Sequence, residues 1–525
     1  MNLLPFLVLT PLLGVPALIA DVAEPGAVAQ RSGAVVRAQV KPGCESRSGA
    51  LCLRESHPQR LKQRARSGNQ RVVRQPQAVR PLPGQLDQVP VFNSNSPELI
   101  QSEGILLSTF PPNGKAQPEA HLNYAFEGRF DIFDHHVVRA QGDRDTRTLF
   151  VGIILHNPGR RAVSVRVREA ASYISQDSPW HERESAESNL ASTSFSGPGS
   201  RLMNDILRDR TQAHWPRDIS IPAGESYLLM NAPIPIRRLS VATDGTLPPG
   251  SEILPPRPAS LGGNRSNARS TLMRLDSSGP VYAASLAMYA PESGGRERVP
   301  SLADWQRLLF RGRLAEMRDR IPTPPRQAAW ADPFIYGRVS GVAQGSRWVA
   351  TLTDNDRAEQ LTIPTPGGQI SYPLSTVDRN TFGTGQVQSA PMLARYADTA
   401  YRAHGNYGIE YSLTMPLHNP TNQSQTVTLS VQTPIQNENL SNALEFLDPP
   451  DDRFFFRGTV LFLFRDETER LRASFIHLTQ RRGQQGEPLV TLTLAPGEQR
   501  DVEMQFLYPP DATPPQVLTI ATQSE

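Results

Sequence analysis

Apolar residues recur at every second position in many short stretches of this chain, which is the period of a half-buried β-strand. Two such stretches, residues 163–167 and 427–431, each follow an apolar run and the tetrapeptide Leu-His-Asn-Pro, at 155–158 and 417–420. Their alternating apolar residues are Val163, Val165 and Val167, and Val427, Leu429 and Val431. The pattern therefore predicts the same order twice: a strand, an Asn-Pro turn and an alternating strand.

Each copy is followed further along the chain by a Gly-Glu turn between two apolar runs, at 224–225 and 497–498. This order of short strands and turns is typical of β-sandwiches. We interpret it as an internal repeat. We predict an all-β fold with minor helices, in which two immunoglobulin-like β-sandwich domains are joined by a short helical linker.

Two stretches have helical spacing instead. Residues 199–210 form one, inside a polar insertion, and residues 301–320 form the other, where Ser301 and Asp304 have the spacing of a capping box. We expect the second helix to end before Pro322 and to pack against or bridge the two sandwiches. A membrane-surface helix is the alternative, but the stretch is short for that role. Further strands are predicted over 347–353, 369–373, 407–416, 426–431, 458–465, 473–477, 489–494 and 500–508.

Length and composition agree with several domains built from short elements. A chain of 525 residues is too long for one ordinary core, and its 48 prolines interrupt it too often for many long helices. The predicted divisions are a signal peptide over 1–29, a disordered basic linker over 30–80, a first β-sandwich domain with a helical insertion over 81–298, a linker helix over 299–329 and a second β-sandwich domain over 330–525.

The N-terminal stretch predicts export. Residues 3–20 carry no charge and are almost all apolar, and Ala27-Val28-Ala29 fits a signal-peptide cleavage site. Three prolines and a length at the lower limit for spanning argue against a membrane anchor. We therefore expect a protein of the periplasm or cell envelope, without a transmembrane segment once the signal is removed.

Charge is unevenly distributed along the chain. Residues 31–80 hold twelve basic and two acidic side chains, and residues 1–30 hold two acidic ones, so 54 − 12 = 42 basic and 51 − 4 = 47 acidic residues remain from 81 onward. This excess of acid disfavours a nucleic-acid partner. We favour a soluble spacer for residues 30–80; the alternative is an arm that binds an anionic envelope polymer or polysaccharide. Cys44 and Cys52 can form a disulfide there in an oxidising compartment, but make a poor zinc site.

The richest cluster of potential metal ligands is the run from Asp131 to His136. On a strand, Asp134 and His136 would share one face and Asp131 and His135 the other, so the four cannot converge on one ion. Asp134 and His136 remain the metal-ligand candidates, with His121 as an additional one. We favour polar residues at a strand end over a metal site.

Other constellations give no catalytic motif or cofactor site. His156 and His418 resemble paired bases, because histidine titrates near neutrality, but each precedes Asn-Pro at a predicted strand end. We interpret them as residues that tie down a turn. Scattered carboxylates suffice for glycoside hydrolysis, but the sequence does not single out a pair. Tyr401 and Tyr407, in a loop rich in His, Gly and Asn, are the ligand-binding candidates.

Several runs resemble a known family: PLPGQLDQVPVFNSNSPELIQSEGILLSTFPP, FDIFDHHVVRA, LHNP, FGTGQVQSAP and AHGNYGIEYSLTMPLHNP. They are similar to a family of exported cyanobacterial proteins that carries only a domain-of-unknown-function label. The resemblance covers roughly residues 75–525 and implies export and a predominantly β body, without catalytic residues. We expect a non-catalytic binding or structural protein, with a carbohydrate-active or other hydrolase as the alternative.

Overall fold

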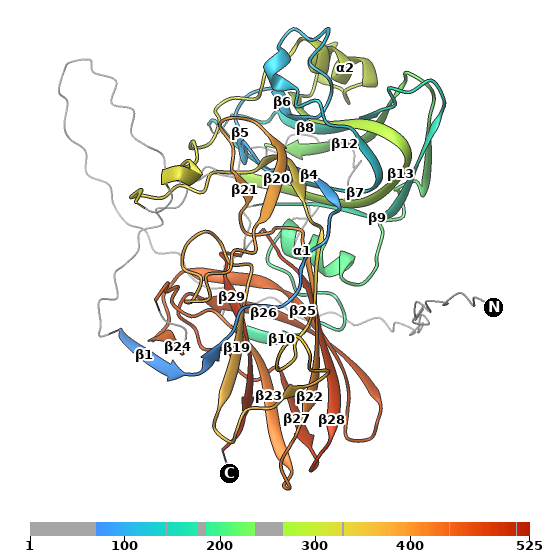
Figure 1. Cartoon of the computed structure of the whole chain (residues 1–525). Coiled ribbons are helices and arrows are strands. Elements are labelled where there is room, and N and C mark those ends of the chain that lie inside the picture. Colours follow the sequence, from blue (N-terminus) through green and yellow to red (C-terminus); the bar gives the residue numbers. More distant parts are fainter. Residues whose placement is uncertain are drawn as a thin grey trace, which may run out of the picture. The chain divides into compact units, whose positions relative to one another are not determined.

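The computed structural model describes residues 70–142, 144–176, 185–236, 266–327, 330–439, 442–510 and 512–524. These ranges are nearly all β, with two α-helices, α1 (Pro198–Ile206) and α2 (Leu302–Arg311), and two short 3-10 helices, η1 (Pro118–Ala120) and η2 (Pro325–Gln327) (Figure 1). The predicted all-β class with minor helices is confirmed. The predicted signal peptide, residues 30–69 of the basic linker and both cysteines lie outside the described residues. No helix in the described ranges is long and apolar enough to cross a membrane.

Within the described residues, the largest sheet has twelve strands. They are β4 (Pro90–Ser94), β5 (Leu99–Ile100), β6 (Gly104–Ser108), β7 (Phe126–Arg139), β8 (Thr148–His156), β9 (Val163–Gln176), β11 (Asp218–Ile221), β12 (Ser226–Pro235), β13 (Ser266–Tyr289), β16 (Ser340–Gln344), β20 (Ala390–Arg395) and β21 (Arg402–Ala403). The long strand β13 pairs with β7 and β9, and its C-terminal part also pairs with β8 and β6. Its register with β7 shifts between Ser277 and Val281.

The second sheet has eight strands, and a third has five. The eight are β3 (Gln85–Leu86), β10 (Ser185–Ser188), β17 (Arg347–Thr351), β18 (Leu361–Thr362), β22 (Glu410–His418), β25 (Phe454–Arg465), β26 (Leu471–Arg481) and β28 (Gln499–Leu507). The five are β2 (Ala78–Val79), β19 (Gln369–Leu374), β23 (Gln425–Gln432), β27 (Val490–Leu494) and β29 (Gln516–Thr522). Two further pairs are β1 (Arg71–Pro76) with β24 (Ala443–Asp448), and β14 (Glu292–Ser293) with β15 (Arg296–Glu297). The strands predicted in the second half of the chain are all present, with shifted ends.

The alternating residues that predicted strands are core residues. Val163, Val165 and Val167 are at most 6% exposed and belong to one hydrophobic core, together with β7 and β8 side chains such as Ile132 and Ile153. Residues 427–431 supply the equivalent apolar side chains to the core that the eight- and five-stranded sheets share. Period-two alternation therefore identified residues of both strands that face a hydrophobic core.

The two Leu-His-Asn-Pro segments make matching turns. The side-chain Nδ2 of Asn157 donates to the carbonyl oxygens of Arg161, Ile221 and Pro222, and its main-chain N–H donates to the carbonyl of Glu225. Asn419 does the same in the second copy; its acceptors are Gln423, Leu494 and Ala495 through Nδ2, and Glu498 through the main chain. Both asparagines are fully buried. In each copy the asparagine joins the Asn-Pro turn to the Gly-Glu turn.

Helix α2 begins as predicted but is shorter. Ser301 caps it, and its main-chain N–H and that of Asp304 exchange hydrogen bonds with each other's side chains, which is the capping box. The helix was expected to run to residue 320 but ends at Arg311. At Gly312, the residue after it, a Cβ atom would lie 2.4 Å from the carbonyl oxygen of Leu308. Beyond it, Leu314 forms a β-bridge with Ile105, and this pairing replaces helical hydrogen bonds.

The two helices pack against different parts of the fold. Helix α2 packs on β6 and β13 of the twelve-stranded sheet, whereas α1, inside the polar insertion, contacts β9 and β13 of that sheet and β25 and β28 of the eight-stranded sheet. Each of the two large sheets contains strands from both sides of residues 299–329. Strands β16, β20 and β21 follow that segment but join the twelve-stranded sheet, and β3 and β10 precede it but join the eight-stranded sheet. The helix that bridges the two large sheets is therefore α1. The division into two immunoglobulin-like domains stays a prediction.

The folded part begins earlier than composition predicted. Residues 71–79, expected within the disordered linker, form β1 and β2 instead. Strand β1 pairs along its whole length with β24, and Arg71 forms an exposed ion pair with Asp448. Its exposed positions are Arg71, Val72, Arg74 and Pro76 and none of its residues is fully buried, so the strand buries too little apolar surface to show in the sequence. The predicted boundary at residue 80 was wrong for this stretch.

Candidate functional site

Strand β7 divides the run from Asp131 to His136 between two faces, as its alternation predicted. Ile132, Asp134 and His136 point into the core of the twelve-stranded sheet. Phe133 belongs instead to the other large hydrophobic core, and Asp131 lies beside it on the lining of a pocket. The four potential ligands of this run are therefore separated by the sheet.

Asp134 and His136 form a buried polar pair. His136 Nε2 lies 3.5 Å from Asp134 Oδ2 and 2.9 Å from the hydroxyl of Ser94, while its Nδ1 lies 2.9 Å from the carbonyl oxygen of Pro97. The hydroxyl of Ser285 donates to Asp134 at 2.6 Å. Both ring nitrogens thus have protein partners, which is the pattern of a satisfied core histidine.

Arg269 lies opposite His136 in the register of β7 and β13, and it completes this polar layer. It is fully buried, and its guanidinium donates to the carbonyl of Pro233 and to the hydroxyl of Ser172. Burial lowers its pKa to about 9, and the charge of Asp134 opposes that shift. The layer is a hydrogen-bonded part of the core, and the described residues hold no group of three or more His, Cys, Asp or Glu side chains arranged for a metal ion.

The other histidine candidates lie apart from this pair. His121 bonds the hydroxyl of Ser108 through Nδ1 at 2.8 Å. His156 bonds Ser226 at 3.1 Å and His418 bonds Gln360 at 3.0 Å, each at the end of its own strand. The neighbouring asparagines make most of the hydrogen bonds in these turns, and His156 adds bonds to Ser226 and to the main chain of Glu225, beside the Gly-Glu turn.

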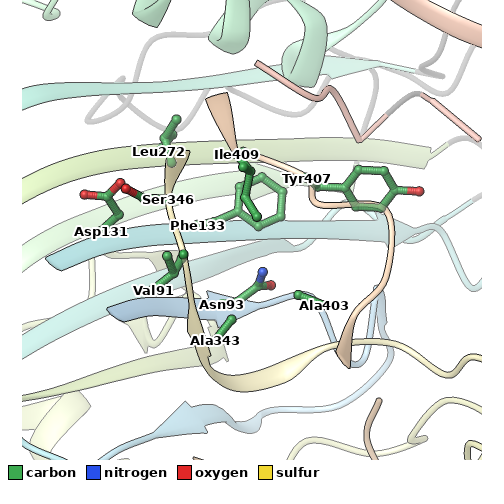
Figure 2. A pocket seen from close by; sticks show the side chains of 12 residues that line it. Val91, Asn93, Asp131, Phe133, Leu272, Ala343, Ser346, Ala403, Tyr407 and Ile409 are labelled. Atoms are coloured by element: carbon green, nitrogen blue, oxygen red, sulfur yellow. The ribbon is translucent and has the colours of Figure 1, made fainter. Parts of the chain in front are cut away.

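A pocket lies where the outer face of the twelve-stranded sheet meets the loops that lead to β17 and β22 (Figure 2). Its empty volume, including space open to solvent, is about 290 Å³. The sheet contributes side chains from β4, β7, β13, β16 and β21, and the loops contribute residues 345–346 and 407–409. Its lining residues are Val91, Asn93, Asp131, Phe133, Leu272, Ala343, Gly345, Ser346, Ala403, Tyr407, Gly408 and Ile409.

Asn93 is the unusual member of this lining. It sits on β4 beside Phe133 in the register of β7, and its side chain extends toward the part of the pocket where Phe133 and Ile409 lie (Figure 2). Asn93 is only 5% exposed, and its amide oxygen Oδ1 has no hydrogen-bond partner in the described part of the chain. A buried polar atom without a partner costs about 1–3 kcal/mol. The site therefore lacks a donor that a ligand can supply.

Asp131, by contrast, is held by two arginines. Arg129 Nε donates to its Oδ1 at 3.2 Å, and Arg274 Nε lies 4.0 Å from Oδ2. Burial raises the pKa of Asp131, and both arginines oppose that shift. Arg274 also binds Glu169 at 2.9 Å and Glu410 at 2.8 Å, so one guanidinium gathers three carboxylates beside the pocket.

The remaining polar groups of the lining also have partners. The hydroxyl of Ser346 donates to Asp87 Oδ2 at 2.9 Å, and that of Tyr407 donates to the carbonyl of Ala512 at 2.9 Å. Tyr407, a ligand candidate from the sequence, is thus one of the lining residues, and its ring extends away from the other lining side chains (Figure 2). Tyr401, the other candidate, is not part of this lining; its ring lies 3.7 Å from the guanidinium carbon of Arg395.

Sequence reasoning missed Asn93 and Ser346. Asn93 follows the apolar run Val89-Pro90-Val91-Phe92. A polar side chain on the same face of a strand as Val91 was the feature that could have identified it as a site residue. The loop residues had no such signal, because their approach to β4 depends on contacts between segments more than two hundred residues apart.

Comparisons with known proteins identify a family. The family described as "Protein of unknown function (DUF3370)" matches residues 77–522. The comparison with curated proteins gave no match. Among solved structures, a chain from "Structure of the Macrobrachium rosenbergii Nodavirus" aligns with 10% identity over 90% of this chain and 96% of that chain, with a TM-score of 0.12. A TM-score this low carries no argument about fold or function.

Proposed function

The chain belongs to the family described as "Protein of unknown function (DUF3370)", and from its geometry we propose a non-catalytic binding protein of the periplasm or cell envelope. Its binding site is the pocket around Asn93. A ligand there would supply the hydrogen-bond donor that Asn93 Oδ1 lacks and would cover Phe133 and Ile409.

One observation carries this proposal: the polar group left without a partner in the pocket is an amide, which neither gives nor takes a proton near neutral pH. The groups that can do acid–base or nucleophilic work are engaged. Asp131 is paired with arginines, and the hydroxyls of Ser346 and Tyr407 donate to protein acceptors. This arrangement favours holding a ligand over transforming it.

Export and envelope contact form a second part of the proposal. They rest on the uncharged stretch 3–20 and on the basic residues between 31 and 80, which would bind an anionic envelope polymer or polysaccharide. Such binding is screened by salt, so washing envelopes with 0.5 M salt (about a 4 Å screening length) should release the protein. Deleting residues 30–69 should leave the protein in the soluble fraction at low salt. If that variant fractionates like the full chain, residues 30–69 do not bind the envelope.

We also propose that the two turn-and-strand units arose from one duplicated sandwich unit. The matching hydrogen bonds of Asn157 and Asn419 support this. So does the pairing order, because β8 pairs with β12 and β9 with β11 just as β22 pairs with β28 and β23 with β27.

A hydrolase is the second candidate function, and the carboxylates around Arg274 favour it. Burial raises the pKa of both Asp131 and Glu169, as a general acid requires. Incubating the full chain with an envelope polysaccharide fraction and measuring new reducing ends separates the two functions. Binding without product supports the first, whereas product that disappears in Asp131→Asn would establish the hydrolase.

A further inference from the structure

We propose that the exposed side of helix α2, together with the neighbouring Lys115, is a contact surface for an anionic lipid bilayer. This surface shares no residue with the pocket around Asn93, so it goes beyond the binding function proposed above. Three features of the helix favour it: the exposed aromatic and apolar side chains, the positive charge around them, and the firm attachment of the opposite side to the sheet.

Helix α2 has one buried side and one exposed side. Trp305 and Leu309, four positions apart, are at most 1% exposed, and they hold the helix on β6 and β13 (Figure 1). Arg307, Phe310 and Arg311 repeat this spacing on the opposite side. The side chain of Arg307 is 66% exposed and Phe310 is 45% exposed. The helix thus presents an aromatic ring beside two guanidinium groups.

Exposed apolar side chains are concentrated around this helix. Ten large apolar side chains are exposed in the described part of the chain, and four of them lie within residues 299–321. The four are Val299, Phe310, Met317 and Ile321. Single exposed apolar side chains are ordinary on a soluble protein, whereas a concentration of them marks an interaction surface. The stretch therefore favours a partner that offers an apolar phase.

The exposed side of the helix is positively charged. Asp304 is the only acidic residue of α2, and it is buried, where it binds Arg298 and Arg307. Arg311 and Lys115 form no ion pair with any residue that the structure describes. An anionic partner would therefore meet cations that lack a carboxylate of their own, and no exposed carboxylate of the helix would repel it.

Lys115 joins the surface from the loop that precedes η1. Its Nζ lies 4.4 Å from the centre of the Phe310 ring, and the main-chain N–H of Ala116 donates to the carbonyl of Phe310 at 2.9 Å. This hydrogen bond satisfies a carbonyl in the last turn of the helix and fixes the loop beside the ring. Partial burial lowers the pKa of Lys115, so a neighbouring phosphate would stabilise its charged form.

A bilayer with anionic headgroups fits the ring and the cations together. A ring such as Phe310 gains free energy at the boundary between headgroups and acyl chains, which a hydrated polysaccharide does not offer. Basic side chains meanwhile reach the phosphates, and each contributes about fivefold in affinity near an anionic membrane. The ten residues of α2 are few for an isolated interfacial helix. Here Trp305 and Leu309 already attach the helix to the sheet, so its folding does not depend on lipid.

The test uses the full chain with Cys44→Ser and Cys52→Ser, so that Phe310→Cys supplies its only thiol for an environment-sensitive nitrobenzoxadiazole label. We expect vesicles of phosphatidylcholine with phosphatidylglycerol to raise the emission of this label and to shift it to shorter wavelength. Vesicles of phosphatidylcholine alone should leave it unchanged. The same label at Leu471→Cys, an exposed position on β26, should respond to neither kind of vesicle.

Paired arginine substitutions test the role of charge. Arg307→Gln with Arg311→Gln should weaken the vesicle affinity, read from the label at position 310, by about tenfold or more. Arg166→Gln with Arg168→Gln is the matched control, because it removes two exposed arginines of β9 and should bind like the parent protein. Circular dichroism establishes that both variants are folded.

Failure would take one of three recognisable forms. If the protein sediments with anionic vesicles while the label at position 310 does not respond, another segment binds the lipid and α2 does not. If neutral vesicles give the same response, the surface does not recognise charge. If dextran sulfate binds in a way that depends on Arg307 and Arg311 while vesicles do not move the label, the partner is an anionic polymer and not a bilayer. Each result leaves the pocket around Asn93 to be judged by its own test.

Discussion

Asn157 and Asn419 make the same hydrogen bonds in the two halves of the chain. Each buried side-chain amide donates to three main-chain carbonyls and joins an Asn-Pro turn to a later Gly-Glu turn. The histidine beside each asparagine bonds one neighbouring side chain, Ser226 or Gln360, and His156 also bonds the main chain of Glu225. The conspicuous histidine is therefore the lesser contributor to the turn.

Replacing either asparagine should destabilise the protein strongly. Asn157→Ala or Asn419→Ala leaves buried carbonyls without donors, and we expect a loss of about 2–4 kcal/mol in the free energy of unfolding. Urea unfolding followed by circular dichroism measures it. His156→Ala and His418→Ala are the matched controls, with losses of about 1 kcal/mol or less. Equal losses for asparagine and histidine variants would show that the assignment is wrong.

Much of the fold follows from local patterns, and the parts that do not are long-range. Val165 and Leu429 are core residues because alternation determines which side of a strand is buried. Ser301 and Asp304 cap α2 because capping depends on residues only three positions apart. The membership of β3 and β10 in the eight-stranded sheet had no local signal, because the pairing partners lie hundreds of residues away.

The candidate site also has features that local sequence patterns predict and features that depend on long-range contacts. The separation of Asp131 from Asp134 was predictable from strand geometry, and Tyr407, which loop composition singled out as a ligand candidate, is one of the pocket's lining residues. The partners of Asp131 were not predictable, because Arg274 reaches it only through the pairing of β13 with β7. Asn93 was missed because an unpartnered amide is recognised only when its surroundings are known.

Gly152 should not tolerate a side chain. A Cβ atom there would lie 2.5 Å from the indole of Trp305, a fully buried residue of α2. Gly152→Ala should therefore cost about 1–3 kcal/mol through overpacking, measured by thermal unfolding. Combining it with Trp305→Leu should cost less than the sum of the two single changes, since the smaller side chain leaves room. Full additivity would contradict the contact.

Arg274 should be far more important to stability than a surface arginine. Arg274→Met leaves Asp131, Glu169 and Glu410 without their shared cation, and breaking a buried pair costs about 3–5 kcal/mol. Arg168→Met is the control, because its ion pair with Asp276 is exposed and should contribute about 1 kcal/mol or less. Urea titration of both variants at pH 7 gives the comparison. Similar losses in the free energy of unfolding for the two variants would show that the ion pairs of Arg274 stabilise the fold no more than an exposed pair does.

Acid should destabilise the fold partly through His121. Burial, with a smaller effect of Lys115, lowers the pKa of His121 to about 4 from an ordinary value near 6.5. Folding thus favours the neutral ring, and its contribution is fully present above pH 6.5 and is lost as the pH falls toward 4. The slope per proton approaches about 1.4 kcal/mol per pH unit. His121→Asn should reduce the pH dependence of the unfolding free energy between pH 6.5 and 4.5; an unchanged slope would exclude this residue.

Asn93→Leu should separate binding from stability. Removing an unpartnered buried amide and filling its place with an apolar side chain of similar size is near neutral or stabilising, so the unfolding midpoint should stay the same or rise. A residue that lowers stability in the free protein yet supports binding is the signature of a ligand site. A loss of several kcal/mol in this variant would indicate a structural role for Asn93 instead.

The most direct test of the account is the affinity of the full chain for an envelope polysaccharide fraction, measured side by side for the unmodified protein, Asn93→Leu and Gln499→Leu. We predict that the unmodified protein and Gln499→Leu, the same change at an exposed amide on β28, bind equally, and that Asn93→Leu binds at least tenfold more weakly while remaining folded. Equal binding by all three proteins would contradict it.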